Sequence, residues 1–211
     1  LFAAPALPAE IRDRDAEIAV FVADDSGKPL EGASVRVFSI RNDKTYFAGE
    51  RRTDAQGRVF LQHLPRGETW VVAYDKARAR SSTRLILSHG LHEARLVLTP
   101  AKALDVLVVN EAEEPVEKAT ITLTSGDPLP YVATTDAEGK ARLDRLGPVP
   151  YRVQAAALGY DESVRTGVVP SVVPLRIKLE RRGVLTVTVR NLDGSVASGA
   201  TVLLAGPLLW P

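Results

Sequence analysis

Two histidines separated by two residues, His89 and His92, come closer to a metal site than any other group in this sequence. Two imidazoles at this spacing can chelate one metal ion on a turn, but a metal site needs at least a third ligand. The flanking Ser88 and Glu93 are weak candidates for that role. The pair is therefore predicted to lie in a solvated loop before a strand, and no metal is expected.

Aspartates recur at the turns, at Asp54, Asp136 and Asp193. Carboxylates from several turns could bind calcium, which takes roughly six to eight oxygen ligands. Asp24 and Asp25 could join Asp54 in such a site only if their loops lie at the same end of the fold. An aspartate also caps its own turn by accepting backbone hydrogen bonds, which explains each position alone. Turn capping is the preferred interpretation, and calcium is the alternative.

The serines lack the setting of a catalytic nucleophile. Ser39, Ser81-Ser82 and Ser125 are not in the G-x-S-x-G turn that exposes a reactive hydroxyl. Gly126-Asp127-Pro128 lacks the further glycines of a phosphate-binding loop. The chain also contains no cysteine, which excludes thiolate chemistry. The protein is therefore predicted to be no enzyme and to use no cofactor.

Composition is that of an ordinary globular protein, with 45% hydrophobic and 25% charged residues in 211. Lys+Arg number 27 against 26 Asp+Glu, so the net charge of +1 predicts no nucleic-acid partner. The basic clusters Arg78-Ala79-Arg80 and Arg181-Arg182 are accordingly interpreted as solvated faces. No run of about 18 apolar residues occurs, so no membrane insertion is expected within this segment.

From Glu17 onward, apolar and polar residues alternate in short runs rich in β-branched and aromatic side chains. Turn residues (Gly, Asp, Pro) separate these runs, as is typical of strands. The chain shows no convincing helical period, and the sequence predicts an all-β protein. Four of these runs supply alternating core candidates: Ile18/Val20/Val22, Val35/Val37, Val59/Leu61 and Trp70/Val72.

An internal repeat organises the strands. Residues 22–37 (V-A-D-D-S-G-K-P-L-E-G-A-S-V-R-V) align with 108–123 (V-V-N-E-A-E-E-P-V-E-K-A-T-I-T-L), 86 positions apart. Residues 53–58 (T-D-A-Q-G-R) match 135–140 (T-D-A-E-G-K), 82 positions apart. The difference in offset places a longer loop after Phe38 in the first unit.

Equivalent positions of the two units are expected to have equivalent structural roles. Gly57 and Gly139 are predicted to supply a left-handed residue to the same hairpin. Trp70 and Tyr151 are predicted to fill the two cores.

The repeat predicts the domain boundaries. Residues 17–100 and 101–182 are expected to form two sandwiches joined by short linkers, as a semi-rigid string. Residues 183–211 repeat the opening of the first unit and are expected to be the first two strands of a truncated third repeat. The apolar residues gathered before Pro211 favour further domains of the same chain beyond it. Residues 1–16 are interpreted as a linker or the remnant of a signal peptide.

The motif G-x-P-L-x-G-A-x-V-x-V, followed by T-D-A-x-G-x-x-x-L-x-x-L-P-x-G and an aromatic-x-V strand, resembles the carboxypeptidase regulatory-like domain. The resemblance implies tandem seven-stranded Greek-key β-sandwiches of the transthyretin-like, Cna-B-like and immunoglobulin-like kind. It is strong in the first unit, whereas Glu113 and Lys118 replace the glycines matching Gly27 and Gly32 in the second.

Cna-B-like domains often carry an isopeptide bond between a lysine and an asparagine or aspartate. The resemblance suggests two candidate pairs, Lys178 with Asn110 and Lys102 with Asp105. Lys178 alternates with the core candidates Leu175, Ile177 and Leu179 and should point outward, so a bond is not expected, although the alternative stays open.

These observations favour a non-catalytic structural or adhesive spacer of a bacterial envelope or secreted protein, which implies an extracytoplasmic location. Its loops or an edge strand would contact a protein or glycan partner. Tyr46 and Phe47, in the longer loop of the first unit, and Tyr131 are the candidate contact residues, with packing over the mouth of the sandwich as the alternative. The competing functions are an accessory domain of a larger enzyme, such as a peptidase, and a carbohydrate-binding module.

Overall fold

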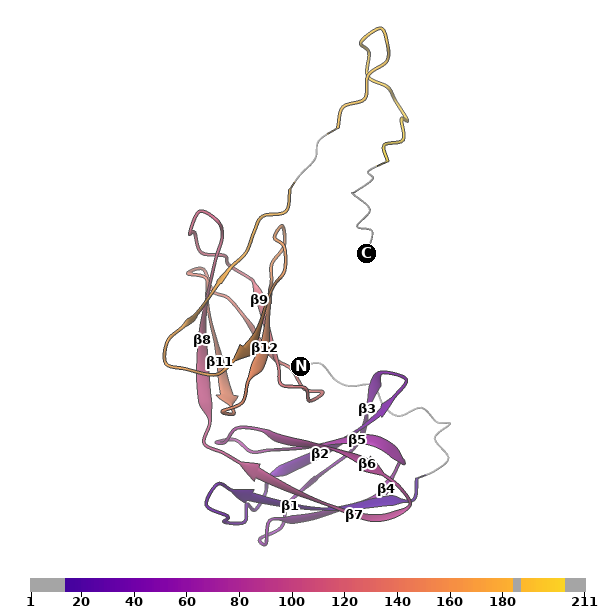
Figure 1. The fold of residues 1–211 in the computed structure, drawn as a ribbon, viewed down its shortest axis with the longest axis vertical. Coiled ribbons are helices and arrows are strands. Elements are labelled where there is room, and N and C mark those ends of the chain that lie inside the picture. The colour runs from indigo at the N-terminus through magenta and orange to yellow at the C-terminus, as the bar shows by residue number, and fades with distance from the viewer. Residues whose placement is uncertain (1–13, 184–186, 204–211) are drawn as a thin grey trace. The chain divides into compact units, whose positions relative to one another are not determined.

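The computed structural model describes residues 14–183 and 187–203, and within these ranges the chain forms strands and turns without a helix (Figure 1). The predicted all-β class is therefore correct. The strands form two successive sandwiches, each of seven strands in two sheets. Both lie in one compact unit that extends to Arg181, and the residues from Arg182 form a second unit.

The first sandwich pairs a three-stranded sheet, ordered β4-β1-β7, with a four-stranded sheet, ordered β3-β2-β5-β6. Its first and last strands, β1 and β7, lie side by side and parallel. The strands are β1 (Ala16–Asp24), β2 (Ser34–Arg41), β3 (Lys44–Arg52), β4 (Arg58–Leu64), β5 (Gly67–Tyr74), β6 (Ser81–Leu87) and β7 (Gly90–Leu98).

The second sandwich repeats this topology, with sheets ordered β11-β8-β14 and β10-β9-β12-β13. Its first and last strands, β8 and β14, are again parallel neighbours. The strands are β8 (Lys102–Val109), β9 (Thr120–Thr124), β10 (Tyr131–Thr134), β11 (Lys140–Leu146), β12 (Tyr151–Ala156), β13 (Ser163–Val168) and β14 (Leu175–Lys178).

Each sandwich has its own hydrophobic core between its two sheets. The alternating residues predicted for the first core, such as Ile18, Val20 and Val22, are fully buried there. Tyr151 is 3% exposed and belongs to the second core, as predicted.

The prediction for Trp70 is wrong. Its neighbours Val71 and Ala73 point into the first core, and strand alternation therefore turns Trp70 and Val72 to the outer face of the sheet. Val72 is nevertheless buried, and Trp70 is half-buried. The outer face of this sheet is therefore partly covered.

The hairpin glycines have the predicted conformation. Gly57 and Gly139 have φ of +70° and +73°, and a Cβ on either would lie 2.4 or 2.5 Å from a carbonyl oxygen, that of Val22 or Val108. The position thus requires glycine for two reasons: a left-handed backbone and a close approach to the opening strand of the same sandwich.

The opening hairpin keeps its shape in the second sandwich without its glycines. Glu113 and Lys118 adopt φ of +65° and +59°, close to the +85° and +73° of Gly27 and Gly32. The same backbone hydrogen bonds close both turns, for example Leu30 N–H to Val22 O and Val116 N–H to Val108 O, each 3.0 Å. Side chains are therefore tolerated here, because both glycine positions have open space around them.

The second unit contains a third copy of that turn. The amide of Ala197 donates to the carbonyl oxygen of Val189 (3.0 Å), and Arg190 pairs with Val196 as Ala23 pairs with Pro29 in the first sandwich. No strand is assigned within 187–203, so the two strands of a third repeat stay a prediction. The predictions for residues 1–13 and for the apolar cluster before Pro211 lie outside the described residues.

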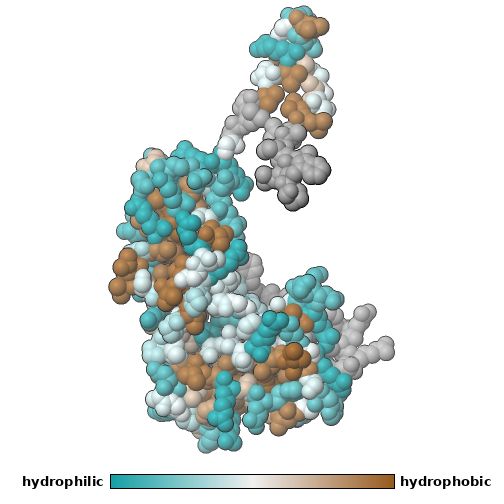
Figure 2. Space-filling view, viewed as in Figure 1, coloured by the Kyte–Doolittle hydropathy of each residue, from teal (hydrophilic) through white to brown (hydrophobic). Residues whose placement is uncertain are grey.

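Hydrophobic residues on the visible face of the molecule form separate patches among hydrophilic ones (Figure 2). No helix in the described part of the chain is long and apolar enough to cross a membrane.

Candidate functional site

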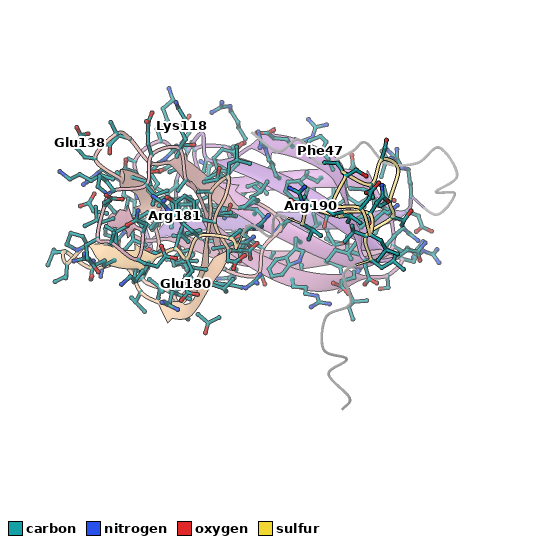
Figure 3. All side chains as sticks on the ribbon, turned by 90° about the horizontal axis from the view of Figure 1, so that it is seen from above. Phe47, Lys118, Glu138, Glu180, Arg181 and Arg190 are labelled. Atoms are coloured by element: carbon teal, nitrogen blue, oxygen red, sulfur yellow. The ribbon has the colours of Figure 1, made fainter. Side chains whose placement is uncertain are left out.

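Tyr46 and Phe47 lie in strand β3 and not in a loop, which corrects the sequence prediction. Asn42 and Asp43, both with positive φ (47° and 58°), make a tight two-residue turn that lets β2 and β3 pair along their length. Adjacent residues of a strand point to opposite faces. Phe47 therefore faces the outer side of the sheet, opposite Phe38, with the two ring centroids 6.0 Å apart and the rings edge-on. Figure 3 labels Phe47 among the side chains of the first sandwich.

Tyr131 opens β10 and is held by packing on several sides. Its ring lies edge-on to Tyr151, with centroids 6.0 Å apart, and its hydroxyl donates to the carbonyl oxygen of Arg145 at 3.2 Å. The guanidinium of Arg80, from the first sandwich, lies 4.2 Å from the ring centroid. Burial raises the pKa of Tyr131 to about 12, although the Arg80 cation opposes this shift.

Arg80 connects the two sandwiches through a nearly buried ion pair. Its Nη2 lies 2.9 Å from Asp127 Oδ1 and its Nε donates to Oδ2 at 3.1 Å, so the pair is two-pronged. The side chains are only 12% and 3% exposed. Arg80 also donates to the carbonyl oxygen of Leu129, and Ser82 donates to Asp127. The predicted solvated face is therefore wrong for Arg80.

The connector between β7 and β8 is fixed to the first sandwich. Only residues 99–101 lie between these strands, and the amide of Ala79 donates to Thr99 O at 2.9 Å. Pro100 pairs with Arg78 in an isolated bridge. On the other side of Ala79, a Cβ on Gly147 would lie 3.7 Å from the Ala79 methyl group, so the second sandwich packs closely here.

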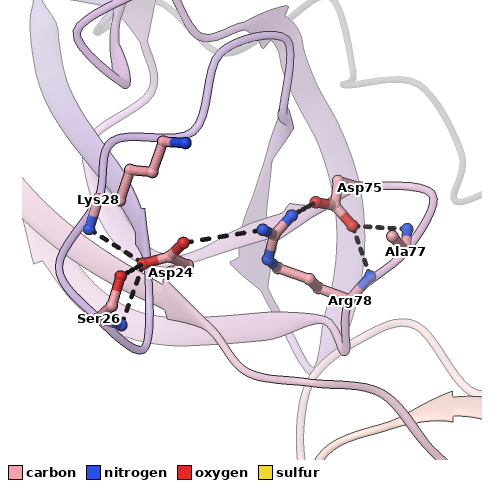
Figure 4. Close-up of polar contacts among 6 residues, drawn as sticks. All are labelled: Asp24, Ser26, Lys28, Asp75, Ala77 and Arg78. Carbon is pink, nitrogen blue, oxygen red and sulfur yellow. Dashed lines mark hydrogen bonds and ion pairs between the residues drawn. The ribbon is translucent and has the colours of Figure 1, made fainter.

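Arg78 has a different role, within the first sandwich (Figure 4). Its guanidinium is 2.8 Å from Asp75 and 3.7 Å from Asp24, and it thereby ties the loop after β5 to the opening turn. Burial alone would raise the pKa of Asp75, but hydrogen bonds from Arg78 and Ala77 outweigh it and lower the pKa. Arg78 is thus also paired, contrary to the prediction.

A polar cluster occupies the outer face of β2, β3 and β5. Glu50 accepts hydrogen bonds from Ser34, from Arg36 Nε (2.9 Å) and from the Tyr74 hydroxyl (2.9 Å). Arg36 also lies over the Tyr74 ring, 5.1 Å from its centroid. Burial alone would raise the pKa of Glu50, but the three hydrogen bonds outweigh it and lower the pKa.

Arg36, Glu50 and Tyr74 border a groove of about 720 Å³, which we call the inter-sandwich groove. One wall is the outer face of β2, β3 and β5 with the loop after β5, and the other is formed by residues 129–132 and 142–145. Phe47 and Tyr131 both line it, whereas Tyr46 does not. Two of the three candidate contact residues thus lie at one site.

The aspartates at the turns cap those turns. Asp24, Asp54 and Asp136 each accept backbone hydrogen bonds from residues two and four positions further on, at 2.7–3.1 Å. No group of three or more metal-ligating side chains occurs in the described part of the chain. His92 lies in β7 and not in a loop, and its Nε2 accepts a hydrogen bond from the Ser88 amide at 3.0 Å.

Neither candidate isopeptide pair is brought together. Lys178 points outward, as predicted, and lies 3.3 Å from Glu113, while the buried Asn110 donates to Glu114. Asp105 pairs with Arg142 at 3.0 Å.

Sequence reasoning missed Arg80 and Asp127. Both stand in short polar stretches whose composition is that of ordinary loops. Asp127 belongs to the loop 125–130 before β10, whereas the matching strands of the first sandwich are joined by the tight turn at Asn42. This difference between the repeats was the only available signal.

Residues 103–180 match the model of the carboxypeptidase regulatory-like domain, which covers the second sandwich from β8 to β14. The resemblance is thereby confirmed for that sandwich. The match includes Glu113 and Lys118, where the opening motif is less typical.

Solved structures with a similar fold include bacterial pilins. The Streptococcal ancillary pilin is 18% identical over 81% of this chain and 63% of that chain, with a TM-score of 0.42. The minor pilin GBS52 of Streptococcus agalactiae is 17% identical over 83% and 100%, with a TM-score of 0.42. The shaft pilin SpaA of Lactobacillus rhamnosus GG is 13% identical over 81% and 99%, with a TM-score of 0.35. Comparison with curated proteins gives no match.

Proposed function

We propose that this chain is a non-catalytic structural and adhesive spacer of an extracytoplasmic bacterial protein, in the envelope or secreted. The observation that carries this proposal is the parallel pairing of the first and last strands in each sandwich. β1 and β7 pair over nine consecutive positions, from Ala16 with Gly90 to Asp24 with Leu98. β8 and β14 pair over four, from Val106 with Leu175 to Val109 with Lys178.

Parallel terminal strands suit a module that bears tension. A force on the two ends of a sandwich pulls the N-terminal end of its first strand against the C-terminal end of its last strand. Because these strands are parallel neighbours, the force acts along them and loads all their hydrogen bonds together. If both strands were pulled from the same end, the hydrogen bonds between them would break one after another.

The fixed connection between the sandwiches supports the same proposal. Residues 99–101 are too few to form a flexible linker, and Ala79 holds Thr99 by a backbone hydrogen bond. The Arg80–Asp127 pair adds a directional contact from one sandwich to the other.

Single-molecule force spectroscopy tests the proposal. The chain has no cysteine, so Arg14→Cys and Gly183→Cys provide unique attachment points. Two unfolding events are expected, the stronger from the first sandwich with its longer parallel pairing. In the matched control, Arg14→Cys with His89→Cys pulls β1 and β7 from the same end and should open the first sandwich at a clearly lower force. Equal forces in both geometries would contradict the load-bearing role.

The extracytoplasmic location is tested on cells of the source organism. An antibody raised against the folded protein should label intact cells or the culture medium. Labelling only after cell lysis would contradict the location and leave the mechanical result unaffected.

The family match of residues 103–180 supports a second candidate function, an accessory module of a larger enzyme such as a peptidase. Under this alternative, the complete natural polypeptide would carry a catalytic domain, and its hydrolytic activity would change when the sandwiches are removed. A polypeptide without such a domain would exclude it.

A further inference from the structure

The aromatic wall of the inter-sandwich groove is specific to the first sandwich. There, Phe38 and Phe47 line the groove side by side, and Trp70, which does not line it, pairs with Phe38 across the sheet. In the second sandwich, the equivalent cross-strand pair is Thr124 with Arg152. An outer sheet face needs no aromatic residues for folding, as the second sandwich demonstrates. The aromatic wall of the first sandwich therefore calls for another explanation.

Phe47 is the accessible member of this wall. It is 37% exposed and borders the groove, whereas Phe38 beneath it is 2% exposed. The edge-on contact with Phe38 holds the Phe47 ring in place and leaves part of it open to the groove. An aromatic face held in this way can pack against the C–H face of a flat ring.

Five arginines line the groove, and they differ in whether a carboxylate neutralises them. Four of the arginines are paired with a carboxylate, and they are Arg36, Arg78, Arg80 and Arg142. Within the described residues, the side chain of the fifth, Arg145, has no hydrogen-bond or ion-pair partner.

Arg145 is held in an unusual backbone conformation. Its φ is +61°, and its carbonyl oxygen accepts the Tyr131 hydroxyl at 3.2 Å. The bulge between Leu143 and Leu146 accommodates this residue. An unpaired guanidinium on a fixed backbone is suited to bind a carboxylate with two parallel hydrogen bonds.

A ring with an apolar face and a carboxylate at its edge fits two features of the groove, the exposed part of Phe47 and the guanidinium of Arg145. Three strands that line the groove, β3, β10 and β11, are edge strands of their sheets. An extended acidic peptide, which could pair with such an edge, is therefore the competing ligand that the titration below distinguishes.

We propose that the inter-sandwich groove binds an oligosaccharide that contains uronic acid, with the sugar ring on Phe47 and its carboxylate on Arg145. The volume of about 720 Å³ lies within the range of roughly 300–1,000 Å³ that is usual for small-ligand sites. This inference deepens the adhesive part of the proposed function and depends on it for its biological meaning. It is independent of the mechanical part.

Calorimetric titration of the full chain with trigalacturonic acid tests the proposal, with neutral galactotriose as the matched ligand. The acidic trisaccharide should bind at least about tenfold more tightly, since a charge-assisted pair is worth more than a neutral contact. Arg145→Asn, a residue that tolerates a positive φ, should weaken binding of the acidic trisaccharide about tenfold or more. The affinity of Arg145→Lys should lie between those of the wild type and Arg145→Asn. Phe47→Ala should weaken the binding of both trisaccharides. Arg165→Gln, on exposed β13 and outside the groove, should change nothing.

Several outcomes would overturn the proposal. One is the absence of binding across a panel of oligosaccharides of galacturonic, glucuronic and mannuronic acid. Another is equal weakening by Arg165→Gln, which would indicate general charge attraction. Equal or tighter binding of hexaglutamate would instead identify the ligand as an acidic peptide. Thermal unfolding of each variant checks that it folds, and the force measurements are unaffected by any of these results.

Discussion

Arg80 of the first sandwich and Asp127 of the second form a two-pronged ion pair, and both side chains are largely removed from solvent. A second arginine–aspartate pair, Arg142 with Asp105, lies exposed within the second sandwich, with side chains 59% and 48% accessible, and only Nη1 of the guanidinium contacts the carboxylate. The two pairs differ in geometry, in burial and in what they connect.

We therefore expect a stronger energetic coupling for the pair between the sandwiches. A double-mutant cycle of Arg80→Ala and Asp127→Ala, measured by urea unfolding, should give a coupling energy of about 1–3 kcal/mol. The same cycle on Arg142 and Asp105 should give a clearly smaller coupling energy, because exposed pairs are screened by water. Similar values would mean that the contact with Asp127 is no more important than a surface pair.

NMR relaxation of the full chain provides the structural readout for the same variants. In the wild type, the amides of both sandwiches should report one common tumbling time. In Arg80→Ala the two sandwiches should have different tumbling times, because the directional contact between them is lost. Two separate values already in the wild type would contradict the fixed connection.

The strand pattern was predictable because alternation and turn residues act locally. Which face of β5 points into the core was not predictable. Its residues Trp70, Val71, Val72 and Ala73 are all apolar, so either face could be the inner one. On the outer face Trp70 lies opposite Phe38 of β2, and such a neighbour across the sheet cannot be read from the sequence of the strand itself.

The site was less predictable than the fold. The position of Tyr46 and Phe47 could have been found, because Asn42-Asp43 is a pair that readily adopts the positive φ of a tight hairpin. The Arg80–Asp127 contact could not have been predicted, because it depends on how the two sandwiches meet. An alignment of the repeats contains no such information. Arg145 likewise has nothing in its sequence surroundings that marks its positive φ.

The hairpin glycines should be far less replaceable than the opening glycines. Gly57→Ala or Gly139→Ala should lower the free energy of unfolding by about 3 kcal/mol. The positive φ is unfavourable for alanine, and the new Cβ would lie about 2.5 Å from a carbonyl oxygen. Gly32 has a similar φ (+73°), but a Cβ there would meet no atom within 4 Å. Gly32→Ala should therefore lower the free energy of unfolding by only about 1 kcal/mol. Chemical denaturation measures all three. A loss at Gly32 equal to that at Gly57 would show that the close approach contributes nothing.

Two buried threonines should be essential to stability in the same way. Thr53 Oγ1 accepts the Ala33 amide at 3.0 Å and donates to Leu30 O at 2.5 Å. Thr135 makes the equivalent pair of hydrogen bonds, at 2.8 and 2.7 Å. Replacing either by valine leaves buried backbone groups without a partner and should cost about 1–3 kcal/mol.

Thr166→Val, on exposed β13, is the matched control and should change the unfolding free energy by less than about 0.5 kcal/mol. If Thr53→Val and Thr135→Val are as mild as this control, the two hydroxyls do not hold the opening hairpin.

The burial of Tyr131 predicts a loss of stability at alkaline pH. Its pKa is about 12 in the folded protein and about 10 in an unfolded chain. Below pH 10 the phenol is neutral in both states and its contribution is fully present. Between about pH 10 and 12 only the unfolded state ionises, so the contribution is lost as the pH rises. The loss should be about 1–2 kcal/mol after allowance for solvent screening.

Urea unfolding at pH 9 and at pH 11.5 measures this effect, with Tyr131→Phe as the control. The variant lacks the hydrogen bond to Arg145 O and the ionisable group, so it should be less stable at pH 9 and lose less on going to pH 11.5. Ultraviolet titration of the folded wild type should show one more tyrosine ionising near pH 12 than the variant shows. If wild type and variant decline in parallel, Tyr131 ionises as readily in the folded chain as in water, and its packing beneath Arg80 is looser than the 4.2 Å contact implies.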